Sequence, residues 1–235
     1  MKNQFLPILA LTLLSALMLG DLNTASADSV VFVNFTNASD TPATAANPFN
    51  ALNSAGGPLA LNDDTGAATG FSVGITSSNN GGNSTGAPSV GGNAAAAGIT
   101  AVEGGTYHFV NDSTTGTYQF SGLDPTQLYT FTVFGSRNAG DFRETRYTLS
   151  DGVTSSFADL TTAGPVNTSN VSLFSNLTAP TGTLNLSFAH QSSNSQAFGY
   201  INAVRIDAID AVPEPSSLAL GLVGLVAMVT RRRRS

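Results

Sequence analysis

From residue 106 onward the sequence is a succession of short β-type segments separated by turn residues. The segment 128–136 shows the pattern, because Tyr129, Phe131 and Val133 alternate with threonines, as in a half-buried strand. We predict strands at 28–36, 70–76, 107–110, 117–121, 128–136, 146–150, 153–157, 171–177, 183–190 and 198–207, and one brief helix within 94–103. Many short strands without a long amphipathic helix predict an all-β fold, a single antiparallel β-sandwich that is jelly-roll-like.

Two stretches are predicted to be loops. Residues 37–60 contain three prolines and a pair of glycines, and we expect Phe49 and Leu52 to hold this loop against the sheet. Residues 77–98 contain six glycines, four asparagines and five alanines and no charged side chain. Such a segment cannot bury enough apolar surface to offset the entropy of ordering it, so we expect a mobile low-complexity loop.

The N-terminus has the three parts of a secretory signal peptide. Lys2 is followed by an apolar stretch over 5–19 and by an A-x-A site, in which Ala25 and Ala27 flank Ser26. Signal peptidase is therefore expected to cleave after Ala27. We predict a signal peptide over 1–27, a β-sandwich ectodomain over 28–210, which is long enough to bury one core, and a C-terminal tail over 211–235.

The tail has three blocks in a fixed order. Its first block is Val212, Pro213, Glu214 and Pro215, its second an apolar run over 218–229, and its third Arg231, Arg232, Arg233 and Arg234. The 15 uncharged residues of 216–230 would make about 22 Å of helix, short of a hydrocarbon core of about 30 Å. A block of arginines is nevertheless typical of a positive-inside anchor. We predict a transmembrane helix over about 217–230 with its arginines in the cytoplasm.

This tail resembles the PEP-CTERM sorting signal of exported bacterial proteins, which is read by exosortase, a membrane-embedded cysteine transpeptidase. The resemblance implies processing by exosortase at or near 213–215, after an inner-membrane intermediate. It also implies a final place at the cell surface or in the extracellular matrix of a Gram-negative-type bacterium. The alternative is an ordinary membrane anchor in which the Pro-Glu-Pro sequence is accidental.

The ectodomain carries a second resemblance. The stretches 121–125, 129–137, 146–148 and 199–203 look like a module of secreted bacterial proteins, a jelly roll similar to galactose-binding-like, carbohydrate-associated domains. This resemblance implies a glycan-binding or structural role, with a polysaccharide as possible partner. It assigns no ligand to a particular position.

Composition excludes several functions. Residues 28–210 contain four arginines, no lysine and thirteen acidic residues, a formal charge of 4 − 13 = −9. Nucleic acid is therefore not expected as a partner, because it requires a basic face. The chain has no cysteine, which excludes disulfides and thiolate metal sites.

Charged residues gather in one short segment, where three of the four ectodomain arginines lie within ten positions. Arginine forks can bind sugar hydroxyls or carboxylates, and nearby aromatic rings can stack on a ligand. We predict a ligand-binding site formed by Arg137, Asp141, Phe142, Arg143, Glu144 and Arg146. The alternative is internal pairing, in which the arginines bind Asp141 and Glu144 and tie down the loop after Arg137.

No convincing catalytic group is present, and we expect the protein not to be an enzyme. Ser84 lies in a formal G-x-S-x-G pattern, but this pattern falls in the glycine-rich loop instead of a strand-to-helix turn. His108 and His190 are expected to be rim or core residues. The alternative is a secreted glycan-active hydrolase, which would need two carboxylates in one cleft, with Asp141 and Glu144 the nearest pair in sequence.

No cofactor is expected. The two histidines of the chain are too few for a zinc site, and calcium is the metal for which the sequence offers a candidate. Asp63 and Asp64 lie in an Asn-Asp-Asp-Thr-Gly segment whose oxygens suit a hard cation. An Asx-rich turn is the alternative interpretation of the same residues.

Overall fold

The computed structural model describes residues 29–77, 79–84, 89–111, 114–191 and 197–210. The predicted signal peptide over 1–27 and tail over 211–235, with its helix at 217–230, lie outside these residues. Within the described part of the chain, no helix is long and apolar enough to cross a membrane.

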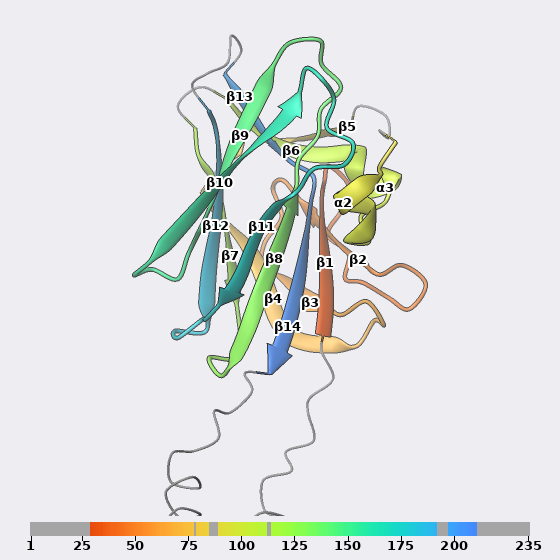
Figure 1. The fold of residues 1–235 in the computed structure, drawn as a ribbon. Coiled ribbons are helices and arrows are strands. Elements are labelled where there is room, and N and C mark those ends of the chain that lie inside the picture. Colours follow the sequence, from red (N-terminus) through yellow and green to blue (C-terminus); the bar gives the residue numbers. More distant parts are fainter. Residues whose placement is uncertain (1–28, 78, 85–88, 112–113, 192–196, 211–235) are drawn as a thin grey trace, which may run out of the picture.

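The described residues form two facing sheets and a smaller third one (Figure 1). The five-stranded sheet has the order β11 (Ser172–Leu177), β8 (Gln127–Phe134), β14 (Ala203–Asp210), β1 (Ser29–Thr36) and β2 (Phe49–Asn53). The six-stranded sheet has the order β10 (Ser155–Ala163), β9 (Arg143–Ser150), β12 (Thr183–His190), β7 (Gly116–Ser121), β4 (Ala68–Ser77) and β3 (Leu59–Asn62). The third sheet has the order β13 (Phe198–Ile201), β6 (Thr106–Asn111) and β5 (Gly82–Ser84).

From β7 onward the chain passes back and forth between the two large sheets. β7, β9, β10 and β12 belong to the six-stranded sheet, and β8, β11 and β14 belong to the five-stranded one. Neighbouring strands of this part pair antiparallel. The predicted fold class, an antiparallel β-sandwich wound like a jelly roll, is confirmed.

The core lies between the two large sheets and follows from the alternation of side chains along each strand. Tyr118 and Phe120 of β7 are fully buried, as are Phe131 of β8 and Phe188 of β12. Phe120 and Phe131 meet edge to face across the sandwich with ring centroids 5.1 Å apart. Each such buried ring contributes about 1.5–3 kcal/mol through removal of apolar surface from water.

The predicted loop over 37–60 contains structure that the sequence pattern did not indicate. β2 lies wholly within it and pairs parallel with β1, an exception in an otherwise antiparallel sandwich, and β3 begins at its end. Phe49 and Leu52 are buried, as expected. The interpretation as a loop was wrong here because its prolines lie between the short strands and not inside them.

The segment 77–98 also carries regular structure where a loop was predicted. β5 pairs with β6, and α2 (Gly92–Ala96) buries Ala94 against Ile99, Phe134 and Ala203. The predicted helix within 94–103 is in fact two short ones, α2 and α3 (Ala101–Gly104), which lie beside the upper part of β1 (Figure 1). Gly98 separates them with a φ of +81°, a conformation that ends a helix.

Candidate functional site

The six residues predicted to form a ligand site do not share one surface. Thr145, Tyr147 and Leu149 of β9 are buried between the sheets, so the alternate residues Arg146 and Thr148 face outward. Arg143, three positions before Arg146, lies on the inward side of the strand. The strand therefore divides the predicted cluster into an inner part and an outer part.

The inner part is built around Arg143. Its Nε and Nη2 donate to the two carboxylate oxygens of Asp141 at 2.9 Å each, and its Nη1 donates to the hydroxyl of Tyr200. The guanidinium also lies 4.9 Å from the ring centroid of Phe198. Only 14% of the Arg143 side chain is exposed. The hydrogen bond from Arg143 lowers the pKa of Asp141. Arg143 is therefore paired internally with Asp141, as the alternative interpretation of the sequence expects.

Arg137 makes a similar arrangement with a second tyrosine. Its guanidinium lies 5.1 Å from the ring centroid of Tyr107 and donates to the Tyr107 hydroxyl. Burial raises the pKa of Tyr107 and the nearby arginine charge opposes that rise. Tyr107 in turn meets Tyr200 edge to face at 5.2 Å. The two arginines thus hold an aromatic cluster together where β13, which pairs with β6, packs against β9.

The outer part contains residues that the sequence did not single out. Nε and Nη2 of Arg146 donate to the two oxygens of Asp159 at 2.7 and 2.8 Å, and Gln191 Nε2 donates to the same carboxylate at 3.1 Å. The guanidinium lies 4.2 Å from the ring centroid of Phe157, which is 63% exposed. We refer to Phe157, Arg146, Asp159 and Gln191 as the Phe157 patch.

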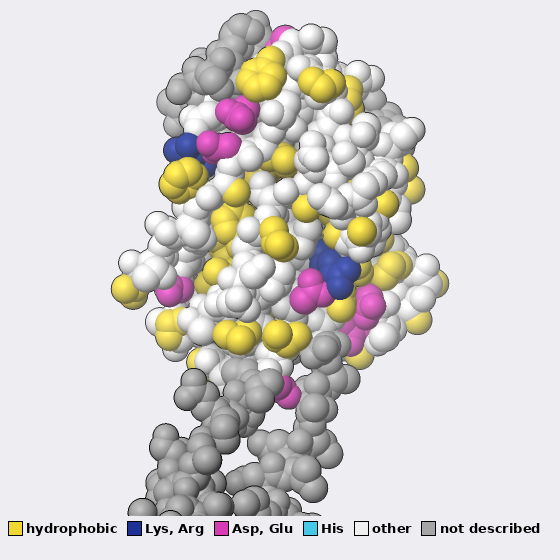
Figure 2. All heavy atoms as spheres, in the orientation of Figure 1, with side chains coloured by type: hydrophobic (Ala, Val, Ile, Leu, Met, Phe, Trp, Pro, Cys, Tyr) yellow, Lys and Arg dark blue, Asp and Glu magenta, His cyan; other side chains and the backbone are white. Residues whose placement is uncertain are grey.

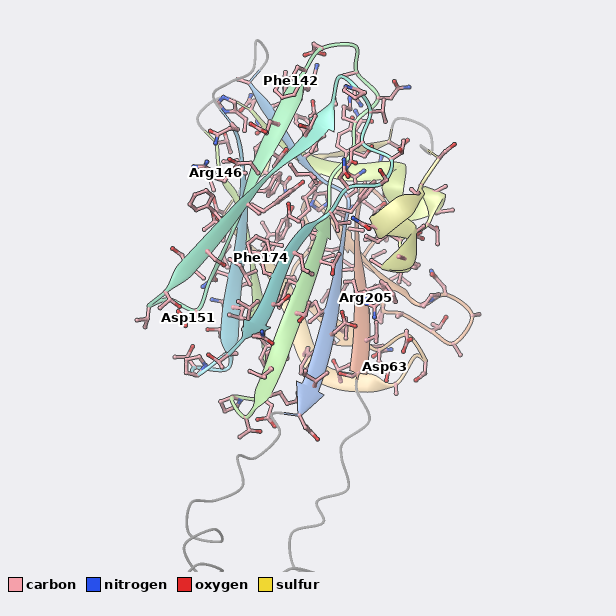
Figure 3. The ribbon with its side chains drawn as sticks, viewed as in Figure 1. Asp63, Phe142, Arg146, Asp151, Phe174 and Arg205 are labelled. Carbon is pink, nitrogen blue, oxygen red and sulfur yellow. The ribbon has the colours of Figure 1, made fainter. Side chains whose placement is uncertain are left out.

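The Phe157 patch is open to solvent and its polar groups are mutually oriented. Figure 3 places Arg146 at the outer edge of the sandwich, and Figure 2 shows basic, acidic and apolar surface side by side at that edge. The hydrogen bond from Arg146 lowers the pKa of Asp159, and Asp159 raises the pKa of Arg146. The arrangement offers one exposed ring face beside fixed hydrogen-bonding groups.

The pairing of residues in the β9–β10 hairpin shows how this patch could have been predicted from the sequence. Asp159 lies directly opposite Arg146, and Phe157 lies opposite Thr148. The predicted strand covers 153–157, whereas β10 spans Ser155–Ala163. A strand extended to include Asp159 would have paired an acid with an arginine across the hairpin, a favourable cross-strand pair.

The sheet surface next to the patch is neutral and polar. In one cross-strand row Phe157 is followed by Thr148, Ser187 and Thr117. In the next row Gln119 donates to Asn185 at 3.3 Å. Hydroxyl and amide side chains can donate and accept hydrogen bonds and carry no charge, so this surface suits uncharged polar ligands.

At the predicted calcium site, one carboxylate oxygen of Asp63 is already hydrogen-bonded to neighbouring residues. Asp63 Oδ1 accepts hydrogen bonds from Thr65 N, Thr65 Oγ1 and Ala67 N at 2.9, 2.6 and 2.9 Å. These hydrogen bonds lower the pKa of Asp63, and the bond from the Thr65 side chain has the largest effect. Asp63 therefore organises an Asx turn. In the part of the chain that the structure describes, no group of three or more His, Cys, Asp or Glu side chains could hold a metal ion.

Neither of two clefts in the described part of the chain is lined by a pair of carboxylates. A cleft of about 360 Å³ has one lining carboxylate, Asp151, and another of about 150 Å³ has none. Asp141 and Glu144 line neither of them. His108 is fully buried, with its ring bonded to Tyr118 and to the backbone, which agrees with the expectation of a core residue.

Comparison with known proteins identifies the tail. A family described as PEP-CTERM protein-sorting motif matches residues 211–234, which confirms the resemblance given for these residues. The motif indicates export and membrane-anchored sorting to the cell surface, and it implies processing by exosortase. No curated protein sequence matches the chain.

Among solved structures, the chain is similar at low identity to two carbohydrate-binding modules and to one extracellular domain. TmCBM61, solved in complex with β-1,4-galactotriose, is 10% identical, with a TM-score of 0.34 over 59% of this chain and 88% of that one. The ANXUR2 extracellular domain from Arabidopsis thaliana is 10% identical, with a TM-score of 0.40 over 77% and 41%. The family 11 carbohydrate-binding module from Clostridium thermocellum, bound to a mixed-linked tetrasaccharide, is 10% identical, with a TM-score of 0.28 over 68% and 100%.

Proposed function

We propose that this protein is a non-catalytic, glycan-binding protein of the cell surface or extracellular matrix of a Gram-negative-type bacterium. Exosortase would process its tail, and the sandwich would bind polysaccharide at the Phe157 patch. The observation that carries the proposal is the exposed ring of Phe157 beside the bidentate Arg146–Asp159 pair. An apolar ring face next to planar polar groups suits a sugar, which has apolar C–H faces and a rim of hydroxyls.

The patch is arranged before any ligand arrives. Arg146 is held by Asp159 and by the ring of Phe157, and Gln191 bonds to the same carboxylate. Little side-chain freedom is therefore lost on binding, which favours affinity. Each exposed sugar hydrogen bond replaces one to water and contributes only about 0.5–1.5 kcal/mol. Adhesion would then depend on many copies on one surface, where a high effective concentration strengthens weak binding.

The position of the patch suits display. β1 begins and β14 ends at the same end of the sandwich (Figure 1), so the matched sorting motif follows directly from that end. Arg146 lies in the opposite half of the molecule (Figure 3). A patch placed there would face away from the point of attachment to the tail.

A glycan-active hydrolase is the alternative function. It would require two carboxylates about 5–9.5 Å apart in one cleft. Asp141 already accepts both hydrogen bonds of an arginine fork, which leaves it poorly suited to proton transfer. We therefore favour binding without catalysis.

The proposal is tested with Phe157→Ala in the full chain, purified in detergent and screened on neutral and acidic polysaccharides by affinity electrophoresis. We expect retardation by at least one polysaccharide and a loss of about tenfold in affinity in the variant, because the stacking face is removed. Val153→Ala, which shortens an 88% exposed side chain of the same hairpin, is the matched control and should bind normally. Unchanged binding by Phe157→Ala, or hydrolysis of the polysaccharide, would contradict the proposal.

A further inference from the structure

A second feature of the sandwich lies on the other side of β10. The cleft of about 360 Å³ is formed between the β9–β10 hairpin and the end of β11. Ser156 of β10 lies opposite the buried Leu149 and so faces inward, whereas its neighbour Phe157 faces outward. The cleft and the Phe157 patch are therefore separate surfaces on opposite faces of one strand.

The cleft is opened by an irregularity in β11. The register of β11 against β8 shifts between Phe174 and Leu177, and Asn176 has a φ of +57°, the one described non-glycine residue with a positive value. Such bulges bend a strand and re-aim its side chains. Asparagine is one of the few residues other than glycine that adopt this left-handed conformation readily, so it suits the irregular position.

The lining of the cleft combines an apolar base with free neutral polar groups. Leu149, Leu177 and Leu184 supply the apolar part. The side chains on the polar rim that make no hydrogen bond within the described residues are Ser155, Ser156, Ser175, Asn176 and Thr178. Four hydroxyls and one amide are thus available to a ligand as both donors and acceptors.

The one charged group of the lining is already engaged. Asp151 Oδ1 accepts from Val153 N at 2.8 Å and from Thr154 N at 2.7 Å, and its Oδ2 accepts from Thr154 Oγ1 at 3.0 Å. No lysine or arginine lines the cleft. A ligand that carries a negative charge would meet the Asp151 carboxylate without a compensating cation.

We propose that this cleft is a second carbohydrate site, which binds a neutral sugar of one or two rings. The leucines would contact the apolar C–H face of the ring, and the free hydroxyls and the Asn176 amide would bind the sugar hydroxyls. The volume lies within the range of about 300–1,000 Å³ typical of small-molecule sites. The proposal does not depend on binding at the Phe157 patch, because the two surfaces share no side chain.

Two substitutions isolate the cleft. Asn176→Gly removes the amide, and glycine adopts the observed positive φ without strain. Ser156→Trp fills the cleft from an exposed position of β10. Val153→Ala, which shortens an 88% exposed side chain of the same hairpin outside the cleft lining, is the matched control. Phe157→Ala is measured beside it to separate the cleft from the Phe157 patch.

The measurement is isothermal titration calorimetry of the full chain in detergent with glucose, galactose, cellobiose, maltose and lactose, and with glucuronic acid as the charged comparison. We expect at least one neutral sugar to bind with a Kd on the order of 1 mM or lower, and glucuronic acid to bind more weakly. Asn176→Gly should weaken binding by about three- to tenfold, and Ser156→Trp should abolish it. Val153→Ala should leave it unchanged.

Three results would overturn the proposal. The first is no binding of any neutral sugar in the panel by a chain whose thermal transition shows that it is folded. The second is binding that survives both cleft variants. The third is binding that is lost in Phe157→Ala alone, which would assign the sugar to the Phe157 patch.

Discussion

Two arginines three positions apart in β9 have opposite surroundings. Arg143 is held by Asp141, Tyr200 and Phe198 and has 14% of its side chain exposed, whereas Arg146 has 38% exposed. In a strand, residues an odd number of positions apart face opposite sides of the sheet. Of these two arginines from one charge cluster in the sequence, Arg143 therefore has a structural role and Arg146 lies at the surface.

His108 gives a prediction at the same scale. Its Nε2 donates to the carbonyl of Thr36 at 2.9 Å, which leaves Nδ1 to accept from the Tyr118 hydroxyl at 2.8 Å. Burial lowers the pKa of His108 to about 4. Unfolded histidine titrates near 6.5, so between these values the unfolded chain binds a proton that the folded one does not.

The free energy of unfolding should therefore decrease as the pH falls from 7 to 4, by about 3 kcal/mol from this residue. Urea unfolding at a series of pH values measures it. His108→Gln, which cannot titrate, should be less stable at pH 7 but should lack this part of the pH dependence. Parallel curves for the two proteins between pH 7 and 4 would refute the assignment.

At the scale of elements, the unexpected strands β2 and β3 depend on one buried side chain. Asn50 Nδ2 donates to the carbonyls of Phe32 and Asn62 at 2.8 Å each. Its Oδ1 accepts from the amides of Ala43 and Asn62 at 2.9 Å each. These four bonds join β1, β2, β3 and the intervening loop into one edge of the sandwich.

Asn50→Ala should lower the free energy of unfolding by about 3–4 kcal/mol, because it leaves several buried backbone groups without partners. Chemical unfolding measures this loss. Asn47→Ala, which removes an exposed side chain from the same loop, should cost less than about 1 kcal/mol. Equal effects of the two substitutions would show that the buried network does not hold this edge.

At the scale of the whole molecule, the matched sorting motif and the β-sandwich occupy different parts of the chain. The motif occupies residues 211–234, directly after β14 ends at Asp210. On the face of the sandwich shown in Figure 2, uncharged side chains predominate and each basic group lies beside an acidic one.

Processing of the tail can be tested in the cell. Exosortase cleavage at or near 213–215 should release the apolar segment, so mass spectrometry of the mature protein should find no peptide from 218–229. Cells without exosortase should retain that peptide. Its presence in the mature protein of exosortase-positive cells would favour an ordinary membrane anchor.

The sequence alone determined the sorting tail and the class of the fold. The tail could be identified because its three blocks are contiguous, and most strands could be located because alternation is a local property of the chain. β2 was missed because its place beside β1 depends on contacts of Asn50 with residues 12 and 18 positions away. The pairing of strands also decided that Arg143 is mostly buried, that the ring of Phe157 is exposed and that a cleft lies beside the irregular end of β11. Such features arise from contacts between distant segments, and only the tertiary structure specifies those.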